Sequence, residues 1–303
     1  MQEEQWGLPI ERSEAERYRR HLLAQGQLDC HLKVRSEGDR ILFPVTSQVE
    51  GAIFTTFEVI HGRVELPRHE RIGGIAIIQD NDPQGAELLL KERSSVHTVL
   101  FAESGVEGEY RTKRFRVLAG EQTTATICTE YGRTFCIDLE KAYFSARLSS
   151  ERQRIVSVMT GGETVLDLFA GVGPFAIMLA PAAQVIWACD INPGAISLLI
   201  KNIALNRVKN VIPVYADGSI LPDIFTTRFD RIIMNLPMIA EQFLPVAFRL
   251  CRPGGVIHLY ALVSEEENIE ERIRAFPVSD IRVHHVRSYA PGKDHRVYDI
   301  TVA

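Results

Sequence analysis

The stretch Asp167-Leu168-Phe169-Ala170-Gly171-Val172-Gly173-Pro174 decides the fold class of this 303-residue chain. It ends an apolar run that predicts a strand, and proline at the first turn favours the start of a helix. Glycines between a strand and a helix let the backbone approach a ligand closely and present free amides to it. Because Gly171-x-Gly173-x-x-Ala176 matches the dinucleotide fingerprint only in part, the loop alone indicates no more than a nucleotide-like ligand.

The chain after Glu151 alternates strands with helices, a rhythm typical of βαβ units and a parallel sheet. In such a sheet, ligands bind at the carboxyl ends of the strands. The predicted strands are 164–168, 185–190, 211–215, 231–235 and 256–261, with helices at 195–206 and 241–251 between them. A helix near 265–276 and two strands, 282–287 and 296–302, follow.

The first half of the chain predicts two smaller units. In residues 1–64, a helix at 14–25 begins at the capping box Ser13-Glu14-Ala15-Glu16, and a turn at 36–40 joins strands 32–34 and 41–45 into a hairpin. Residues 65–145 predict an α+β unit with strands 73–78 and 98–101, a helix at 84–92, and alternating stretches 114–118, 124–130 and 133–139 typical of an antiparallel sheet. We therefore expect an α/β protein with domains 1–64, 65–145 and 146–303.

Composition excludes several classes of protein. A hydrophobic content of 46% is enough for packed cores, but no apolar run reaches the ~20 residues that a membrane span needs. The acidic N-terminus lacks the layout of a secretory signal, so we expect a cytoplasmic protein. The five cysteines show no CxxC pair or zinc-ligand spacing, and His284 and His285 point to opposite faces of a strand, so no metal site is predicted.

Charge is distributed unevenly along the chain. The net charge of −5 argues weakly against a nucleic-acid partner, which prefers a basic surface. Residues 110–154, however, hold nine Lys and Arg against five Asp and Glu, and residues 282–296 are also basic. These segments are candidate contacts for phosphates, although solvated faces of ordinary elements would have the same composition.

Two acidic residues follow the second and third strands of the alternating region. Asp190 lies 19 residues after Gly171, close to the ~20 expected for a carboxylate that binds both hydroxyls of an adenosine ribose. Asp217, in Ala216-Asp217-Gly218, is placed to accept from the adenine amino group. Each acid alone is more often a helix cap, but together the two describe an adenosine pocket.

Asn235-Leu236-Pro237 follows the fourth predicted strand. At this position, base-modifying methyltransferases that resemble this chain have an Asn-x-Pro or Asn-Pro-Pro element. The asparagine carboxamide offers both a donor and an acceptor to the edge of a planar base. The alternative is a simple turn, because the residue before a proline is pushed out of helical conformation.

With Asp190-Ile191-Asn192-Pro193 and residues 143–152, Tyr-Phe-Ser-Ala-Arg-Leu-Ser-Ser-Glu-Arg, these motifs resemble the archaeal and eukaryotic tRNA (guanine-37-N1)-methyltransferase family over the whole chain. Gly108-Glu109-Tyr110-Arg111 is similar too. Ala146 and Ser150 stand where the family often has proline and threonine. The resemblance implies a class I, Rossmann-like methyltransferase domain that uses S-adenosylmethionine, behind a tRNA-docking domain and a middle domain.

The resemblance also implies roles for individual residues. Glu151 is the expected general base, Arg111 its electrostatic partner and Asn235 the residue that holds the guanine. The residues expected to bind the cofactor are Asp167, Phe169, Gly171, Gly173, Asp190, Ile191, Asp217, Gly218, Asn235 and Arg147. Those expected to bind the substrate are Tyr143, Phe144, Arg147 and Pro237.

These residue types suit the chemistry of guanine N1. This atom carries a proton at neutral pH, so methylation needs a base within hydrogen-bond reach and a cation near O6, where negative charge grows. The target nucleotide must leave the anticodon loop and is expected to stack on Tyr143 or Phe144. The activated methyl group of the cofactor makes a metal unnecessary. For Glu151 and Arg111, the alternative is an ordinary surface ion pair.

Two other functions remain open from the sequence. A relative in the wybutosine branch would act on the same nucleotide, either by transferring the aminocarboxypropyl arm of the cofactor or by methylating a tricyclic guanine derivative. A tRNA-binding relative without turnover is the other alternative, although intact Asp190, Asp217 and Glu151 argue against it. Because three units on one chain can clasp the anticodon loop and body of a tRNA, we expect a monomer.

Overall fold

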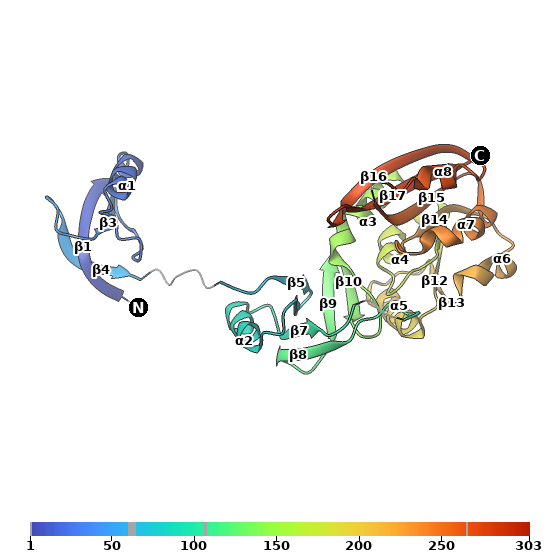
Figure 1. Cartoon of the computed structure of the whole chain (residues 1–303), viewed down its shortest axis with the longest axis horizontal. Coiled ribbons are helices and arrows are strands. Elements are labelled where there is room, and N and C mark those ends of the chain that lie inside the picture. The colour runs from blue at the N-terminus through green and yellow to red at the C-terminus, as the bar shows by residue number, and fades with distance from the viewer. Residues whose placement is uncertain (1, 60–64, 106–107, 265) are drawn as a thin grey trace. The chain divides into compact units, whose positions relative to one another are not determined.

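The computed structural model describes residues 2–59, 65–105, 108–264 and 266–303 (Figure 1). The chain divides into two compact units, Met1–Leu66 and Pro67–Ala303, which are described separately below. The predicted domain boundary at 64 and the predicted helix start at 265 lie outside the described residues. The predicted division at 145 falls inside the second unit and stays a prediction.

The first unit is a four-stranded antiparallel sheet with one helix. Its elements are β1 (Gln2–Glu11), α1 (Ala15–Ala24), β2 (Arg35–Glu37), β3 (Arg40–Val45) and β4 (Ile53–Glu58), with strand order β2-β3-β1-β4. Leu22 of α1 packs with Phe43 and Val45 of β3 in the core. The predicted helix is confirmed, and a hairpin that ends in β3 is present. Its first strand, however, is β2 at 35–37, which overlaps the predicted turn 36–40, and not the predicted strand 32–34. Strands β1 and β4 were not predicted.

The predicted capping box at α1 is wrong. Glu14, in near-helical backbone conformation, takes the N-cap position, and no side chain among the described residues caps the helix. Glu16 instead accepts from Arg20 Nε at 3.0 Å, one turn along the helix. The helix begins one residue later than the motif requires, so Ser13 lies outside it.

The second unit begins with a small mixed sheet. Its strands are β5 (His69–Ile72), β6 (Ile75–Ile78), β7 (Thr98–Ala102) and β8 (Phe115–Gly120), and helix α2 (Pro83–Glu92) connects the parallel strands β6 and β7. A separate hairpin follows, formed by β9 (Ala125–Glu130) and β10 (Arg133–Asp138). The three predicted antiparallel stretches are therefore divided between two sheets. Gly120, with φ +87°, is where the chain leaves β8, and a Cβ there would meet His97 O at 2.1 Å.

The rest of the second unit is built around a seven-stranded sheet of order β13-β12-β11-β14-β15-β17-β16. Strands β11 to β15 are parallel, and β17 and β16 add to β15 as an antiparallel hairpin. The strands are β11 (Glu163–Asp167), β12 (Ala183–Asp190), β13 (Val211–Tyr215), β14 (Phe229–Met234), β15 (Cys251–Ser264), β16 (Val278–Ala290) and β17 (Lys293–Val302). The helices are α3 (Ser149–Val158), α4 (Pro174–Leu179), α5 (Pro193–Leu205), α6 (Leu221–Ile224), α7 (Leu244–Leu250) and α8 (Ile269–Ile273).

Helices cover both faces of this sheet. Side chains alternate along each strand, so Val165 of β11 packs with α3, α4 and α5, while Leu166 packs with α6, α7 and α8. Strands buried on both faces explain the nearly continuous apolar runs in the sequence. The order of the strands reverses between β11 and β14, and such a reversal opens a ligand crevice at the carboxyl ends of the strands.

The β9–β10 hairpin is fastened to the large domain by polar side chains. Asn202 of α5 accepts from Cys136 N at 2.7 Å and donates to Cys136 O at 3.0 Å, so it extends the edge of the hairpin. Arg152 of α3 donates to both carboxylate oxygens of Glu130, and both side chains are buried. These contacts fix the start of the loop 139–148, which leads into the candidate site.

Candidate functional site

A pocket of about 410 Å³ lies at the carboxyl ends of β11, β12, β13 and β14. It collects residues that lie far apart in the sequence. Of the residues singled out from the sequence, those that line it are Arg111, Tyr143, Phe144, Phe169, Gly171, Asp190, Ile191, Asp217, Gly218, Asn235 and Pro237. This volume falls within the range of small-molecule and cofactor sites.

The glycine loop turns between β11 and α4 in left-handed backbone conformations. Gly171 has φ +55° and Gly173 has φ +87°, values that glycine adopts at little cost. A Cβ on Gly173 would meet Leu199 Cδ1 at 2.3 Å, so this glycine allows α4 to pack on α5. Gly171 reaches the pocket, whereas Gly173 is not part of its described lining.

Asp190 organises the adenosine end of the pocket. Its Oδ2 accepts from Gly171 N at 2.7 Å and its Oδ1 accepts from Asn192 N at 2.8 Å. Burial raises the pKa of Asp190 despite these two bonds. The cap of α5 is Asn192, which accepts from Gly194 N, so Asp190 is not a helix cap. Each carboxylate oxygen retains a lone pair for a ribose hydroxyl.

Asp217 serves as a cap as well as lining the pocket. Its Oδ1 accepts from Ser219 N at 2.8 Å at the start of a short 3₁₀ turn, while the residue itself is exposed. Both interpretations of Asp217 are therefore compatible with its position. The backbone thus holds the Asp217 carboxylate at the rim of the pocket.

Asn235 and Pro237 line the pocket directly after β14. Asn235 Oδ1 is buried without a hydrogen-bond partner from any described residue. A buried acceptor left unpaired costs about 1–3 kcal/mol, so the position favours a polar ligand that donates to it. A simple turn would leave this oxygen in water or on the backbone.

Arg111 enters the pocket from the loop between β7 and β8. Its φ of +53° is uncommon for a residue with a side chain, and strain of this kind clusters at functional sites. Its guanidinium forms no ion pair with the described residues, and Glu151 pairs instead with Arg154. The alternative of an Arg111–Glu151 surface pair is therefore wrong.

Four predicted site residues are not in the described lining of the pocket: Asp167, Gly173, Arg147 and Glu151. Arg147 pairs with Glu70 at 2.9 Å, and its side chain is half exposed. Asp167 lies beneath the glycine loop and is 1% exposed, and neither of its oxygens has a hydrogen bond within the described ranges. Burial and the Asp190 carboxylate raise the pKa of Asp167 to about 7.

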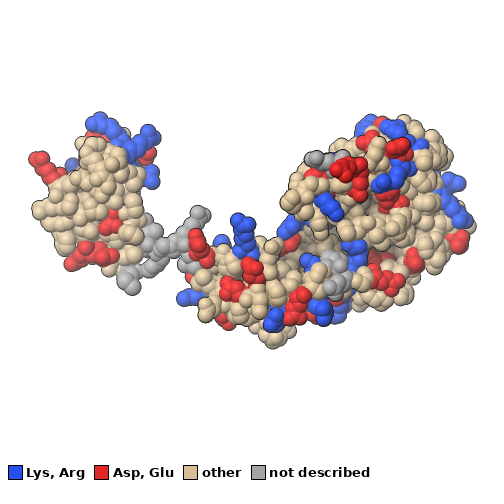
Figure 2. Space-filling view, in the orientation of Figure 1, with Lys and Arg blue, Asp and Glu red and all other residues tan. Residues whose placement is uncertain are grey.

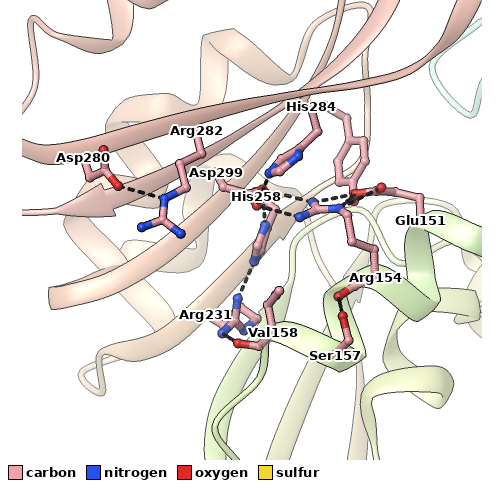
Figure 3. A network of polar contacts seen from close by, with 11 residues as sticks. Glu151, Arg154, Ser157, Val158, Arg231, His258, Asp280, Arg282, His284 and Asp299 are labelled. Atoms are coloured by element: carbon pink, nitrogen blue, oxygen red, sulfur yellow. Dashed lines mark hydrogen bonds and ion pairs between the residues drawn. The ribbon is translucent and has the colours of Figure 1, made fainter.

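Glu151 belongs to a buried polar network next to the pocket (Figure 3). Arg154 donates to both of its carboxylate oxygens, at 2.7–3.0 Å, and Tyr260 Oη donates to Oε1 at 2.8 Å. In the figure, Arg154 lies between Glu151 and Asp299, whose Oδ2 accepts from Arg154 at 2.7 Å. Glu151 therefore has partners that the sequence did not suggest.

The same network continues across four strands of the sheet, β17, β15, β14 and β11. His258 Nδ1 lies 2.6 Å from Asp299 Oδ1, and its Nε2 faces Arg231, which also pairs with Glu163. Because Arg231 can only donate, His258 carries its proton on Nδ1. Burial lowers the pKa of His258, so it is neutral, whereas bonds from His258 and Arg154 outweigh burial and hold the pKa of Asp299 well below its usual range.

The pocket also contains residues that the sequence did not single out. Arg287, Tyr289 and His295 come from the β16–β17 hairpin, and Met238 and Phe243 follow Asn235. From the sequence, Arg287 stood out only as one of the positive charges in the basic stretch 282–296. Nothing in the local sequence distinguishes His295, because polar and apolar residues follow one another around it as in any strand of a hairpin.

Five of the nine basic residues in 110–154 form ion pairs. Figure 2 shows Lys and Arg interspersed with Asp and Glu over the visible face of residues 67–303. Ion pairs involve Arg116, Lys141, Arg147, Arg152 and Arg154. In the described part of the chain, the basic residues of this segment that form no ion pair are Arg111, Lys113, Arg114 and Arg133.

Two kinds of feature are absent from the residues that the structure describes. Within them, no group of three or more His, Cys, Asp or Glu side chains is arranged to hold a metal ion. His284 and His285 contact different acids, Asp299 and Asp294. No helix among the described residues is both long and apolar enough to cross a membrane.

A doubly wound sheet with a glycine loop after its first strand and an acid after its second defines the class as a Rossmann-like, nucleotide-binding α/β enzyme. Residues 126–286 match the TRM5/TYW2 methyltransferase domain, and residues 7–53 match the tRNA methyltransferase 5 N-terminal domain. The chain belongs to the TRM5/TYW2 methyltransferase family. The predicted family and fold class are confirmed.

Three similar proteins are informative. The tRNA (guanine(37)-N(1))-methyltransferase Trm5b of Pyrococcus abyssi is 37% identical over 95% of this chain and 95% of its own. A tRNA(Phe) (4-demethylwyosine(37)-C(7)) aminocarboxypropyltransferase of Methanocaldococcus jannaschii is 31% identical over 77% of this chain and 96% of its own. A solved complex of aTrm5 with tRNALeu is 29% identical, with a TM-score of 0.78 and coverage of 98% and 100%.

Proposed function

We propose that this enzyme transfers a methyl group from S-adenosylmethionine to N1 of guanine 37 in tRNA. The observation that carries the proposal is a single pocket in which Asp190 and Gly171 adjoin Asn235, Arg111 and Tyr143. This pocket has an end suited to adenosine and an end suited to a planar base. The similarity to Trm5b over nearly the whole chain supports this substrate.

The residues of the adenosine end fit the cofactor, because Asp190 presents a carboxylate already oriented by two backbone amides. Asp190 would hold the ribose hydroxyls, Asp217 the adenine amino group, and Phe169, Gly171, Ile191 and Gly218 the faces of the ligand. Structures of the family have been solved with S-adenosylmethionine. When bound, the cofactor supplies an activated methyl group.

On the substrate side, Asn235 would clamp the guanine edge and Arg111 would stabilise negative charge on O6. Tyr143, Phe144 and Pro237 would enclose the base. Glu151 would take the proton from N1, which leaves the N1 electron pair free to accept the methyl group. Arg154 and Tyr260 orient the Glu151 carboxylate, and Oε2, which among the described residues accepts only from Arg154 Nε, retains a lone pair for the N1 proton.

The wybutosine-branch transferase and the non-catalytic relative remain alternatives. Against the first, residues 7–53 match the Trm5 N-terminal domain, and the aminocarboxypropyltransferase aligns with only 77% of this chain. Against the second, the carboxylates at the adenosine end are intact and oriented. The N-terminal unit is the expected docking domain for the body of the tRNA.

The decisive experiment offers the full chain two tRNA transcripts that differ only in G or A at position 37, with mass analysis of the modified nucleoside. We expect a gain of one methyl group on guanosine 37 and no product with A37. Transfer of a larger, aminocarboxypropyl group would support the rival transferase. If calorimetry detects no binding of S-adenosylmethionine, the non-catalytic relative is supported.

A further inference from the structure

The β16–β17 hairpin directs three polar side chains into the pocket. Arg287 and His295 are directly opposite each other in the strand register, so their side chains lie on the same face of the hairpin. Tyr289, two residues beyond Arg287, also lines the pocket, and the Arg287 guanidinium lies 5.6 Å from the centre of its ring. The hairpin therefore forms a polar wall of the pocket.

His295 is buried in this wall, where its ring lies 5.9 Å from the ring of Tyr260 between centroids. It is 3% exposed, and both of its ring nitrogens lack a hydrogen bond from the residues that the structure describes. Burial, and then the charge of Arg287, lowers the pKa of His295 to about 4. The imidazole is therefore neutral near pH 7 and offers one donor and one acceptor.

Unpaired buried atoms at this wall favour a ligand that pairs with them. Arg287 Nε is also buried without a partner from the described ranges, and so is Asn235 Oδ1 in the same pocket. Each such atom destabilises the folded protein when nothing satisfies it, because it has given up its hydrogen bonds to water. Three residues with unsatisfied atoms around one pocket indicate a polar ligand between them rather than an apolar one.

The order of strands assigns this wall to the base end of the pocket. Asp190 and Asp217 follow β12 and β13, on one side of β11, whereas β16 and β17 lie on the other side, beyond β14 and β15. His295 pairs in register with Leu262 near the carboxyl end of β15. Asn235 thus lies between the adenosine carboxylates and the hairpin along the sheet edge.

We propose that His295, with Arg287 beside it, hydrogen-bonds the nucleobase that the enzyme methylates and so contributes to the choice of substrate. This inference rests on the proposed function and adds a substrate-binding residue to it. Asn235 and the hairpin then contact the base from two sides. The neutral imidazole suits a neutral purine edge, because it donates and accepts without bringing a charge into a buried site.

The test replaces His295 with phenylalanine, which keeps a ring of similar size and removes both nitrogens. We expect kcat/KM for the G37 transcript to fall about tenfold or more, the usual effect of one lost hydrogen bond. The dissociation constant for S-adenosylmethionine should stay within about twofold. The unfolding midpoint should not fall, because the substitution removes two unsatisfied polar atoms. H295Q, which retains a donor and an acceptor, should recover part of the loss.

The matched control is H285F, at an exposed position on the same hairpin, which should leave kcat/KM unchanged. Wild-type kcat/KM in H295F overturns the inference, and so does an equal loss of cofactor affinity, which would assign His295 to the cofactor. If H295F melts early, H295Q decides by the same two measurements. Failure of the wild-type enzyme to methylate guanine 37 would instead overturn the proposed function.

Discussion

The two ends of the pocket differ in how their polar atoms are satisfied. At the adenosine end, both oxygens of Asp190 already accept backbone amides, and Asp217 accepts one as well. At the base end, Asn235 Oδ1 and both nitrogens of His295 lack partners among the described residues. The chain itself orients the first set, whereas the second set is completed only by a ligand. We expect the adenosine end to govern affinity for the cofactor and the base end to govern rate and selectivity.

The largest effect is expected at the adenosine end. D190A removes the carboxylate that orients Gly171 and would hold two ribose hydroxyls, and bonds to a charged group contribute about 1.5–3 kcal/mol each. The dissociation constant for S-adenosylmethionine, measured by calorimetry, should rise ~10²-fold or more. D217N at the exposed rim is the matched control and should change it only severalfold. If D217N raises the dissociation constant more than D190A does, Asp217 and not Asp190 is the main carboxylate that binds the cofactor.

At the base end, Glu151→Gln should lower the single-turnover rate of methylation by ~10² or more, because an amide cannot take the N1 proton. Affinities for cofactor and tRNA should be retained. Measurement by rapid quench with G37 tRNA separates chemistry from product release. E140Q, at an exposed position, is the control for loss of a carboxylate. An undiminished rate in E151Q would remove Glu151 from the mechanism.

Behind Glu151, Tyr260 is predicted to act as a positioning residue. It is fully buried, and its hydroxyl donates to Glu151 at 2.8 Å. Y260F removes that bond with little change in volume and should slow single-turnover methylation about tenfold, with cofactor affinity unchanged. In an E151Q background, Y260F should have almost no further effect, because it acts through the carboxylate. Additive losses in the double variant would show a merely structural role.

The same contrast explains what the sequence predicted well. The adenosine end consists of short local elements, a glycine loop and acids at strand ends, whose spacing along the chain reflects the βαβ repeat. The strand order and the helices from β11 to α7 follow from the same repeat. Asp190 and Asp217 were therefore found from the sequence, and both line the pocket.

The base end depends on contacts between distant segments. Arg287 and His295 reach the pocket only because β16 and β17 add to the far side of β15, a pairing that no local pattern specifies. The buried partners of Glu151 likewise come from β15 and from the next turn of α3. Strands β1 and β4 were missed for a related reason, because β1 pairs with segments about 30 and 50 residues away.

Asp167 is the exception at the adenosine end, since neither oxygen makes a well-formed hydrogen bond with the described residues, although the amides of Ala176 and Phe169 favour its charged form. Its pKa is about 7 in the folded protein, against an ordinary value of 3.8. Between these values the native carboxyl keeps a proton that the unfolded chain has lost. The native state is therefore stabilised less as pH rises through this window, by up to about 1.4 kcal/mol per pH unit from this group.

D167N removes this titration, so it should stabilise the protein relative to wild type more at pH 8 than at pH 5. The unfolding midpoints of both proteins at these two pH values provide the measurement, and D217N is the control without a buried charge. If the difference in unfolding midpoint between D167N and wild type is the same at pH 5 and pH 8, Asp167 keeps an ordinary pKa. In that case the amides of Phe169 and Ala176, which partly offset the effect of burial, satisfy Asp167 as fully as the backbone satisfies Asp190, and the adenosine end has no exception.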